Sequence, residues 1–313
     1  MPDIIISEFM DAAPIERLRA GHSVHIDDGL WNKRSELEAL AADALAIIVR
    51  NRTRVDAALI EKAPRLAVVG RLGVGLDNID VEACKARGIA VCPAIGANAV
   101  AVAEYVLASS LMLLRFAAFS GTARLMEGQW PREEMGAGHE GAGKTLGLVG
   151  FGSIGQVTAA KARALGFATV AADAFLPESD PAWRATERVA LPALLARADI
   201  ITLHCPLTPQ TRSLIGAAEI AALKPGAMLI NTARGGIVDE AALAAALRAG
   251  HLAGAAIDVF ETEPLTGETA AHFAGLPNVI LTPHIAGITV ESNTRISAVT
   301  VDNVLKVLKE REL

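Results

Sequence analysis

The segment Thr145-Leu146-Gly147-Leu148-Val149-Gly150-Phe151-Gly152-Ser153-Ile154-Gly155 decides the fold of this chain. Its apolar run, Leu146 to Val149, predicts a buried strand, and the residues from Gln156 to Leu165 predict a helix. Between them, the spacing Gly-x-Gly-x-x-Gly permits a tight turn, lets the backbone approach a pyrophosphate and lets the helix pack closely on the strand. Free N–H groups at the start of the helix then face the anion. The segment therefore predicts a dinucleotide-binding unit.

A second predicted strand, Ala168 to Ala172, ends at an acidic residue, Asp173, which lies 18 residues after Gly155. A carboxylate at this place accepts hydrogen bonds from the adenosine ribose hydroxyls. It also repels a 2′-phosphate, and the following residues, Ala174-Phe175-Leu176-Pro177, contain no arginine. We therefore expect the cofactor to be NAD rather than NADP.

Length and composition favour a two-domain globular protein. The chain has 313 residues, of which 52% are hydrophobic and 20% charged, and its net charge of −6 does not favour a nucleic-acid partner. Three cysteines without metal-ligand spacing indicate a reduced protein with no disulfide framework. The start of the chain lacks a basic leader, and the apolar run Tyr105 to Leu114 is too short to cross a bilayer. We expect a cytoplasmic protein that binds no membrane.

The first part of the chain alternates short β-rich runs with helical stretches, which indicates parallel βαβ units up to about residue 97. A long, largely buried helix is predicted from Ala99 to about Phe119, and Gly121 to Gly143 reads as a helix end and a loop. The expected strands of this part are Ile4–Ile6, Ser23–Ile26, Ala46–Val49, Leu66–Gly70 and Ile89–Cys92, and the expected helices include Ser35–Ala44, Asp56–Lys62 and Val81–Arg87.

The alternation resumes after Asp173 and completes a six-strand doubly wound pattern. A long helix from about Thr289 to Leu313 is expected to return to the first domain, since chain termini tend to lie near each other. This predicts one domain from residues 1–97 plus 285–313 and another from residues 98–284. The remaining expected strands are Asp199–Leu203, Ala227–Asn231, Gly254–Val259 and Val279–Thr282, and the helices are Ala190–Ala196, Ala217–Ala222 and Asp239–Ala249.

Arg234, Glu263 and His284 each follow a predicted strand of the second half. Ligands bind beyond the carboxyl ends of the strands in open α/β sheets, so these side chains are expected to converge on the cofactor. Histidine can donate a proton near neutral pH, a carboxylate beside it favours the imidazolium, and an arginine fork suits a carboxylate with a carbonyl oxygen. Taken singly, each is more often an ordinary structural residue. Together they suit hydride transfer between nicotinamide and a 2-oxo acid.

Several motifs resemble the D-isomer-specific 2-hydroxyacid dehydrogenase family, in the family's order and over almost the whole chain. They are the glycine motif, Arg71-Leu72-Gly73-Val74-Gly75-Leu76-Asp77-Asn78-Ile79-Asp80, His204-Cys205-Pro206-Leu207-Thr208, Asn231-Thr232-Ala233-Arg234-Gly235, Asp258-Val259-Phe260-Glu261-Thr262-Glu263-Pro264 and Thr282-Pro283-His284.

This resemblance implies an α/β fold with two doubly wound parallel-sheet domains, in which a Rossmann NAD domain is inserted into a flavodoxin-like substrate domain. It implies Arg234, Glu263 and His284 as the catalytic residues, Asp258 near the nicotinamide carboxamide, and the backbone of Val74 and Gly75 around the substrate carboxylate. It also implies a homodimer built largely on the NAD domain, and we expect no regulatory domain of the kind that longer phosphoglycerate dehydrogenases have. The implied cofactor site consists of Gly150, Gly152, Ser153, Ile154, Gly155, Asp173, His204, Pro206, Thr211, Thr232, Ala233, Arg234, Asp258 and His284.

Arginines follow two predicted strands of the first domain, and we expect some of them to contact the substrate. Arg50, Arg52 and Arg54 follow one strand and Arg71 follows the next, which is more positive charge than a single carboxylate requires. We expect Arg50, Arg52 or Arg71 to bind a second anionic group, a phosphate or a sulfonate. Resemblance to phosphoglycerate and sulfolactate dehydrogenases supports this; solvated surface arginines are the alternative, above all for Arg54.

Other functions are less well supported. A glyoxylate or hydroxypyruvate reductase is the alternative within the family, and an NAD(H)-sensing corepressor-like protein is the alternative from another class. No metal is expected, because the remaining histidines show no ligand grouping. Lys144 and Thr145 lack the spacing of a P-loop, which argues against an NTPase.

Overall fold

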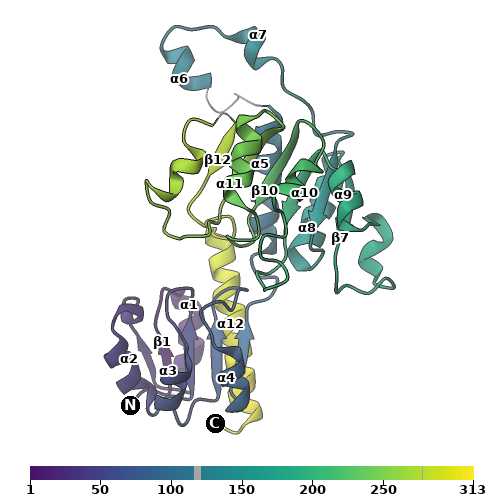
Figure 1. Ribbon diagram of the computed structural model, residues 1–313. Coiled ribbons are helices and arrows are strands. Elements are labelled where there is room, and N and C mark those ends of the chain that lie inside the picture. Colours follow the sequence, from purple (N-terminus) through teal and green to yellow (C-terminus); the bar gives the residue numbers. More distant parts are fainter. Residues whose placement is uncertain (116–120, 277) are drawn as a thin grey trace. The chain divides into compact units, whose positions relative to one another are not determined.

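The computed structural model describes residues 1–115, 121–276 and 278–313, and the chain divides into two compact units (Figure 1). Unit 1 comprises Met1–Asn98 and Ile288–Leu313, and unit 2 comprises Ala99–Gly287. The predicted domain boundaries, after residues 97 and 284, lie close to these.

Unit 1 contains a five-stranded parallel sheet in the order β2-β1-β3-β4-β5. This is the flavodoxin-like order that the family resemblance implied. Strands of such a sheet are covered on both faces, so they are short apolar runs, which is why the sequence identifies them well. The strands are β1 (Ile4–Ile6), β2 (Val24–Ile26), β3 (Ala46–Val49), β4 (Val68–Arg71) and β5 (Ala90–Pro93).

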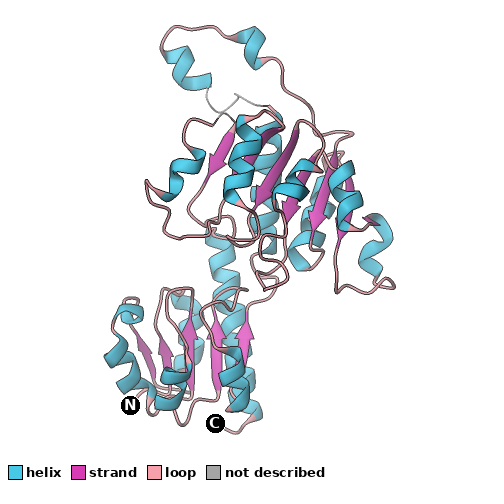
Figure 2. Cartoon of the chain, viewed as in Figure 1, coloured by secondary structure: helices cyan, strands magenta, loops and turns pink. Residues whose placement is uncertain are grey.

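Helices cover both faces of this sheet (Figure 2), and alternate residues of β1 show how. Ile4 and Ile6 belong to the core cluster that includes α1 and α12, whereas Ile5 belongs to the cluster that includes α2 and α3. The last helix packs so closely on β4 that a Cβ at Gly70 would lie 2.8 Å from Val304 Cγ2. The helices are α1 (Ala12–Arg19), α2 (Arg34–Ala41), α3 (Ala57–Lys62), α4 (Val81–Ala86) and α12 (Val290–Glu310), with a 3-10 turn η1 (Leu30–Asn32).

Unit 2 contains a parallel sheet in the order β12-β11-β10-β9-β6-β7-β8, which is the six-strand Rossmann order with one further strand, β12, at one edge. Seven strands are present where six were predicted, because the two-residue edge strand β8 is too short and too polar to give a sequence signal. The strands are β6 (Thr145–Val149), β7 (Ala168–Ala172), β8 (Glu187–Arg188), β9 (Ile200–Leu203), β10 (Ala227–Asn231), β11 (Leu252–Ile257) and β12 (Val279–Leu281).

Two predictions for the helices of unit 2 were wrong. The region Gly121 to Gly143 contains α6 and α7, and α8 begins three residues earlier than predicted, so that Ser153, Ile154 and Gly155 form its first turn. The predicted end of α5 near Phe119 lies outside the described residues. The helices are α5 (Ala99–Leu114), α6 (Gly121–Met126), α7 (Arg132–Met135), α8 (Ser153–Ala164), α9 (Leu191–Arg197), α10 (Ala217–Ala221) and α11 (Glu240–Arg248), with 3-10 turns η3 (Pro181–Ala185) and η4 (Thr269–Phe273).

Neither α5 nor α12, the longest helices of the described residues, combines the length and the apolar character that crossing a bilayer requires.

Candidate active site

Two of the three glycines in the turn between β6 and α8 are required by close backbone contacts. Gly150 has a φ of +95°, and a Cβ there would lie 2.8 Å from the backbone carbonyl of His204. A Cβ at Gly155 would lie 2.5 Å from the Gly150 oxygen. Around Gly152 a Cβ would meet no atom within 4 Å, so the turn is open at the start of α8. This is the shape that lets a pyrophosphate approach the backbone.

Asp173 lies just beyond β7 and is bonded to this turn. Its carboxylate accepts the backbone N–H of Phe151 at 2.6 Å and those of Phe175 and Leu176 at 2.8 Å each. Burial by itself would raise the pKa of Asp173, but the three N–H donors outweigh burial, and the pKa lies below its ordinary value. The carboxylate is therefore a fixed negative charge beside the glycine turn.

A cavity of about 1460 Å³ in unit 2 joins these features. Six of the predicted cofactor residues line it: Gly150, Gly152, Asp173, His204, Pro206 and Thr211. The sequence did not identify Trp183 and Arg188, which also line it, because they follow Asp173 by ten residues or more and belong to no motif. His204 is half-buried at the wall of the cavity, and desolvation lowers the pKa of its imidazole to about 3, so this histidine is neutral.

Ser153, Ile154 and Gly155 form the first turn of α8, and the remaining predicted cofactor residues lie at the ends of β10, β11 and β12. The buried hydroxyl of Thr232, next to Ala233, has no hydrogen-bond partner within the described part of the chain. A buried hydroxyl without a partner is costly, and a bound ligand would supply one. Together with the open turn at Gly152 and the acidic group at Asp173, this fits an NAD molecule.

Glu263 and His284 form the centre of the predicted catalytic group. Glu263 Oε2 lies 2.9 Å from His284 Nδ1, and Glu263 Oε1 accepts the N–H of Phe260 at 3.0 Å. Burial would raise the pKa of Glu263, but these hydrogen bonds, with the nearby charges of His284 and Arg234, hold it below its ordinary value. Glu263 is therefore an ionised carboxylate that fixes the orientation of the imidazole.

Arg234 follows β10 and its backbone is held by the last residue of that strand. Asn231 Nδ2 donates to Arg234 O at 3.0 Å, and Asn231 Oδ1 accepts the N–H of Ala233 at 3.1 Å. The guanidinium of Arg234 donates to Ala233 O at 2.6 Å. The structure thus brings all three predicted catalytic residues to one end of the sheet of unit 2.

Asp258 supports the backbone that carries His284. Its carboxylate, 1% exposed, accepts the N–H of Ile285 and of Ala286 at 2.8 Å each and the hydroxyl of Thr282 at 2.6 Å. His284 has a φ of +57°, an unfavourable conformation for histidine, and these bonds hold the chain in it. Sequence reasoning assigned Asp258 only to the nicotinamide; its contacts on both sides of His284 were not foreseen.

The loop after β3 in unit 1 is built around a buried carboxylate. Glu8, 4% exposed, accepts the backbone N–H groups of residues 50–53 at distances of 2.8 to 3.2 Å. Arg50 Nη2 donates to Asn293 Oδ1 at 2.8 Å, and the guanidinium of Arg52 lies 4.9 Å from the centre of the Trp31 ring. The loop that presents both arginines is therefore rigid.

Arg71, which the sequence also predicts to bind the substrate, has its guanidinium bonded to its own loop. It is 8% exposed, and its guanidinium donates to Gly75 O at 2.7 Å and to Leu72 O at 2.5 Å. These bonds shape the loop that contains Val74 and Gly75. We therefore assign Arg71 to the loop's conformation and leave the second anion to Arg50 and Arg52.

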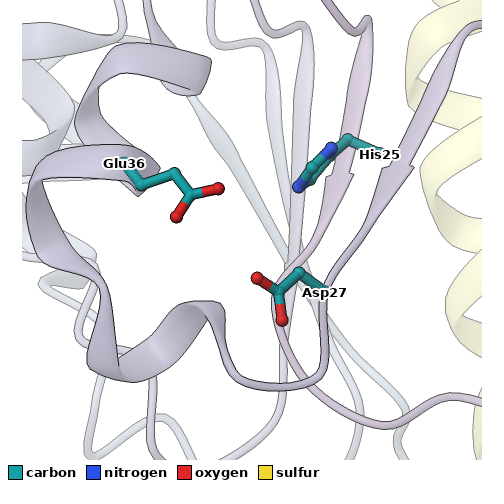
Figure 3. Close-up of side chains that lie close together, drawn as sticks. All are labelled: His25, Asp27 and Glu36. Atoms are coloured by element: carbon teal, nitrogen blue, oxygen red, sulfur yellow. The ribbon is translucent and has the colours of Figure 1, made fainter.

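One group of possible metal ligands lies among the described residues, at the edge of unit 1. His25, Asp27 and Glu36 point toward a common centre (Figure 3), with ligand atoms within 4.8 Å of one another. Lys33 Nζ lies 2.6 Å from Asp27 Oδ2 and 4.0 Å from Glu36 Oε2, so an ammonium group already lies against both carboxylates. We therefore assign no metal to this group, and the expectation of a metal-free protein stays a prediction.

Comparisons with known proteins agree with this geometry. Residues 107–286 match the family described as D-isomer specific 2-hydroxyacid dehydrogenase, NAD binding domain. An (S)-sulfolactate dehydrogenase of Chromohalobacter salexigens is 52% identical over 99% of this chain and 100% of its own. A hydroxypyruvate reductase of Thermotoga maritima is 40% identical over 88% and 89%. The solved structure of a D-lactate dehydrogenase from Aquifex aeolicus, complexed with NAD and lactic acid, has a TM-score of 0.84 and 29% identity over 98% and 95%.

Proposed function

The chain belongs to the D-isomer-specific 2-hydroxyacid dehydrogenase family and is an NAD-dependent oxidoreductase of 2-hydroxy acids, and we propose that its substrate carries a second anionic group, with (S)-3-sulfolactate as the first candidate. The observation that carries this proposal is the loop of residues 50–53. Four backbone N–H groups of this loop are bound by the buried carboxylate of Glu8, so Arg50 and Arg52 are presented on a fixed support.

Stereochemistry is consistent with this candidate. In sulfolactate the carbon that bears sulfur outranks the carboxylate carbon, whereas in lactate the carboxylate outranks the methyl group. The same spatial arrangement that is named (R) in D-lactate is therefore named (S) in sulfolactate. An (S)-sulfolactate dehydrogenase thus handles the D arrangement that the family name describes, and the 52% identical relative fits the family's stereochemical rule.

Proton transfer is assigned to His284. Bound NAD supplies the hydride chemistry. Glu263 holds Nδ1 of the imidazole, so we assign Nε2 as the atom that takes the proton from the 2-hydroxyl group on oxidation and returns it on reduction. Arg234 provides the positive charge for the substrate's carboxylate and its reacting oxygen, for which a guanidinium fork is suited. The backbone of Val74 and Gly75 is proposed to bind the same carboxylate.

The proposal includes a homodimer in the cytoplasm. The helix α5 exposes Leu111 and Met112, each 38% exposed, and the α6–α7 segment exposes Met126 at 84% and Trp130 at 79%. Exposed large apolar side chains on neighbouring elements support a protein partner, here a second copy of the chain. The cysteines of the described residues are all unpaired, which supports a reducing compartment.

A substrate panel tests the proposal. The panel comprises 3-sulfolactate with 3-sulfopyruvate, 3-phosphoglycerate, glycerate with hydroxypyruvate, and lactate, each assayed with NAD or NADH. We expect the highest kcat/KM for 3-sulfolactate and 3-sulfopyruvate. His284→Ala should lower kcat by about 10²- to 10⁴-fold on every active substrate, as expected for loss of a general acid–base. A preference for hydroxypyruvate or lactate would contradict the second anionic group.

Two arginine variants locate that group. Arg50→Gln and Arg52→Gln should each raise KM for the sulfonate roughly 10- to 100-fold, the loss of ~1.5–3 kcal/mol for a hydrogen bond to a charged group, without a comparable change for lactate. Arg54→Gln, in the same loop, is the matched control and should change neither KM. An equal loss on both substrates would place Arg50 and Arg52 away from the distal group.

A further inference from the structure

An arginine, Arg188, lines the cofactor cavity together with Asp173, although the residues directly after Asp173, Ala174 to Pro177, contain no arginine. Arg188 comes from β8, whose neighbour β7 leads directly into Asp173, and its backbone is in register with Ala171. Both Arg188 and Asp173 line the cavity. Besides burial, which raises it, and the three backbone N–H donors, which lower it, the positive charge of Arg188 makes a smaller contribution to lowering the pKa of Asp173, in agreement with this placement.

Aromatic rings support the guanidinium of Arg188. It lies 5.7 Å from the centre of the Trp183 ring, and Trp183 stacks on Phe151 with ring centres 4.7 Å apart. Phe151 belongs to the glycine turn, and Trp183 is further fixed by its indole N–H, which donates to Pro177 O at 2.9 Å. Arg188 is thus placed on a packed surface that continues into the pyrophosphate turn.

Glu178 neutralises this arginine. The two side chains form an ion pair, in which the side chain of Glu178 is 87% exposed and that of Arg188 is 34% exposed. An exposed pair of this kind contributes little to stability, so its energetic value for the fold does not explain its position. Its position in the cavity, next to the carboxylate expected at the adenosine ribose, points to cofactor selection instead.

We propose that Arg188 is a binding residue for a phosphate on the 2′-oxygen of adenosine, and that Asp173 and Glu178 keep it from acting as one. Asp173 repels the phosphate and Glu178 occupies the guanidinium. The preference for NAD would then depend on two carboxylates, rather than on the absence of a cation. This inference rests on the cofactor assignment of the proposed function, but it concerns the adenosine half of the cofactor and is testable without a substrate.

Calorimetric titration with two nucleotides provides that test. For each variant, the affinity for adenosine 2′,5′-bisphosphate is divided by the affinity for adenosine 5′-monophosphate, so that losses common to both nucleotides cancel. Glu178→Gln should raise this ratio at least about tenfold, which is ~1.4 kcal/mol. Glu187→Gln is the matched control. It removes the same charge from an exposed pair with Arg197, which does not line the cavity, and it should leave the ratio unchanged.

The role of Arg188 is isolated by a double variant. Arg188→Ala combined with Glu178→Gln should cancel the gain, and Asp173→Asn combined with Glu178→Gln should increase it further. When an active 2-oxo acid is reduced with NADPH, kcat/KM for NADPH should change across these variants in the same order as the nucleotide affinity ratio. A gain that persists without Arg188, or an equal gain in Glu187→Gln, would overturn the inference.

The titrations also separate this inference from the proposed function. If the unmutated protein binds adenosine 5′-monophosphate and the variants behave as described, the inference stands even where the sulfonate is not the preferred substrate. If the unmutated protein already prefers the 2′-phosphorylated nucleotide, Asp173 and Glu178 do not exclude it, and the inference fails.

Discussion

At the scale of single residues, the pair Glu263–His284 couples the catalytic group to the stability of the fold. The pKa of Glu263 lies below its ordinary value of 4.5 in the folded protein. Folding therefore favours the ionised carboxylate. The resulting stabilisation is complete above pH 4.5 and is lost as the pH falls through the lowered pKa of the folded state.

The expected measurement is the free energy of unfolding as a function of pH. The stability advantage of the unmutated protein over Glu263→Gln should shrink as the pH falls below about 4.5, where the carboxylate of the unfolded chain becomes protonated. Glu261→Gln is the control. Glu261 pairs with Arg212 at 3.3 Å, but its side chain is 64% exposed and water screens the pair, so this variant should change the pH dependence of stability little. A difference that grows as the pH falls below about 4.5 would have the wrong sign for a carboxylate with a lowered pKa.

At the scale of elements, the loops after β10 and β11 approach each other at Gly235. A Cβ at this position would lie 1.9 Å from Phe260 O and 2.4 Å from Glu261 N, both of which are backbone atoms. No side-chain rotation relieves such a contact. Because Arg234 precedes Gly235 and Glu263 follows Glu261, the close approach of the two loops bears on the positions of both proposed catalytic residues.

Gly235→Ala is therefore expected to displace both loops. The free energy of unfolding should fall by ~1–3 kcal/mol, as for other overpacked sites, and kcat/KM should fall with it even at temperatures where the variant is folded. Gly267→Ala is the matched control, because a Cβ there would meet no atom within 4 Å and its φ requires no glycine. Denaturant unfolding and steady-state kinetics check both. Unchanged kinetics in Gly235→Ala would mean that the contact does not position the catalytic residues.

At the scale of the whole molecule, the exposed apolar residues of unit 2 predict association. The α6–α7 segment stands away from the sheet of unit 2 (Figure 1), and it exposes Met126 and Trp130. A lone chain would keep these side chains in water, whereas a second copy would bury them. We expect sedimentation equilibrium to give twice the chain mass of 32.6 kDa.

Combining Met112→Asp with Met126→Asp should shift that mass toward 32.6 kDa, because a buried charge without a partner opposes association. Val290→Asp is the control. It adds one negative charge at another exposed apolar residue, 80% exposed, at the start of α12 in unit 1, and it should leave the mass unchanged. A monomeric unmutated protein would remove the dimer from the proposed function.

The sequence by itself determined the two parallel sheets, the glycine turn and the three residues that we propose to be catalytic. Strands such as Ala46–Val49 and Ala227–Asn231 were predicted with their observed bounds, because parallel strands buried on both faces are continuous apolar runs. Gly150, Asp173 and His284 were identified because each lies at a strand end, a place that local pattern fixes. The predicted start of α8 was late because the glycines of the turn conceal the first helical residues.

Only the tertiary structure decided which side chains meet. Arg188 lies beside Asp173 because β8 pairs with β7, and a two-residue polar strand has no periodicity to reveal that pairing. Arg71 turns into its own loop, and Glu8 binds the loop of residues 50–53 from more than forty positions away. Local preferences come from neighbours in the chain, and they determine elements and their ends. Partners across a sheet depend on strand order and register, which are settled only when the whole core packs.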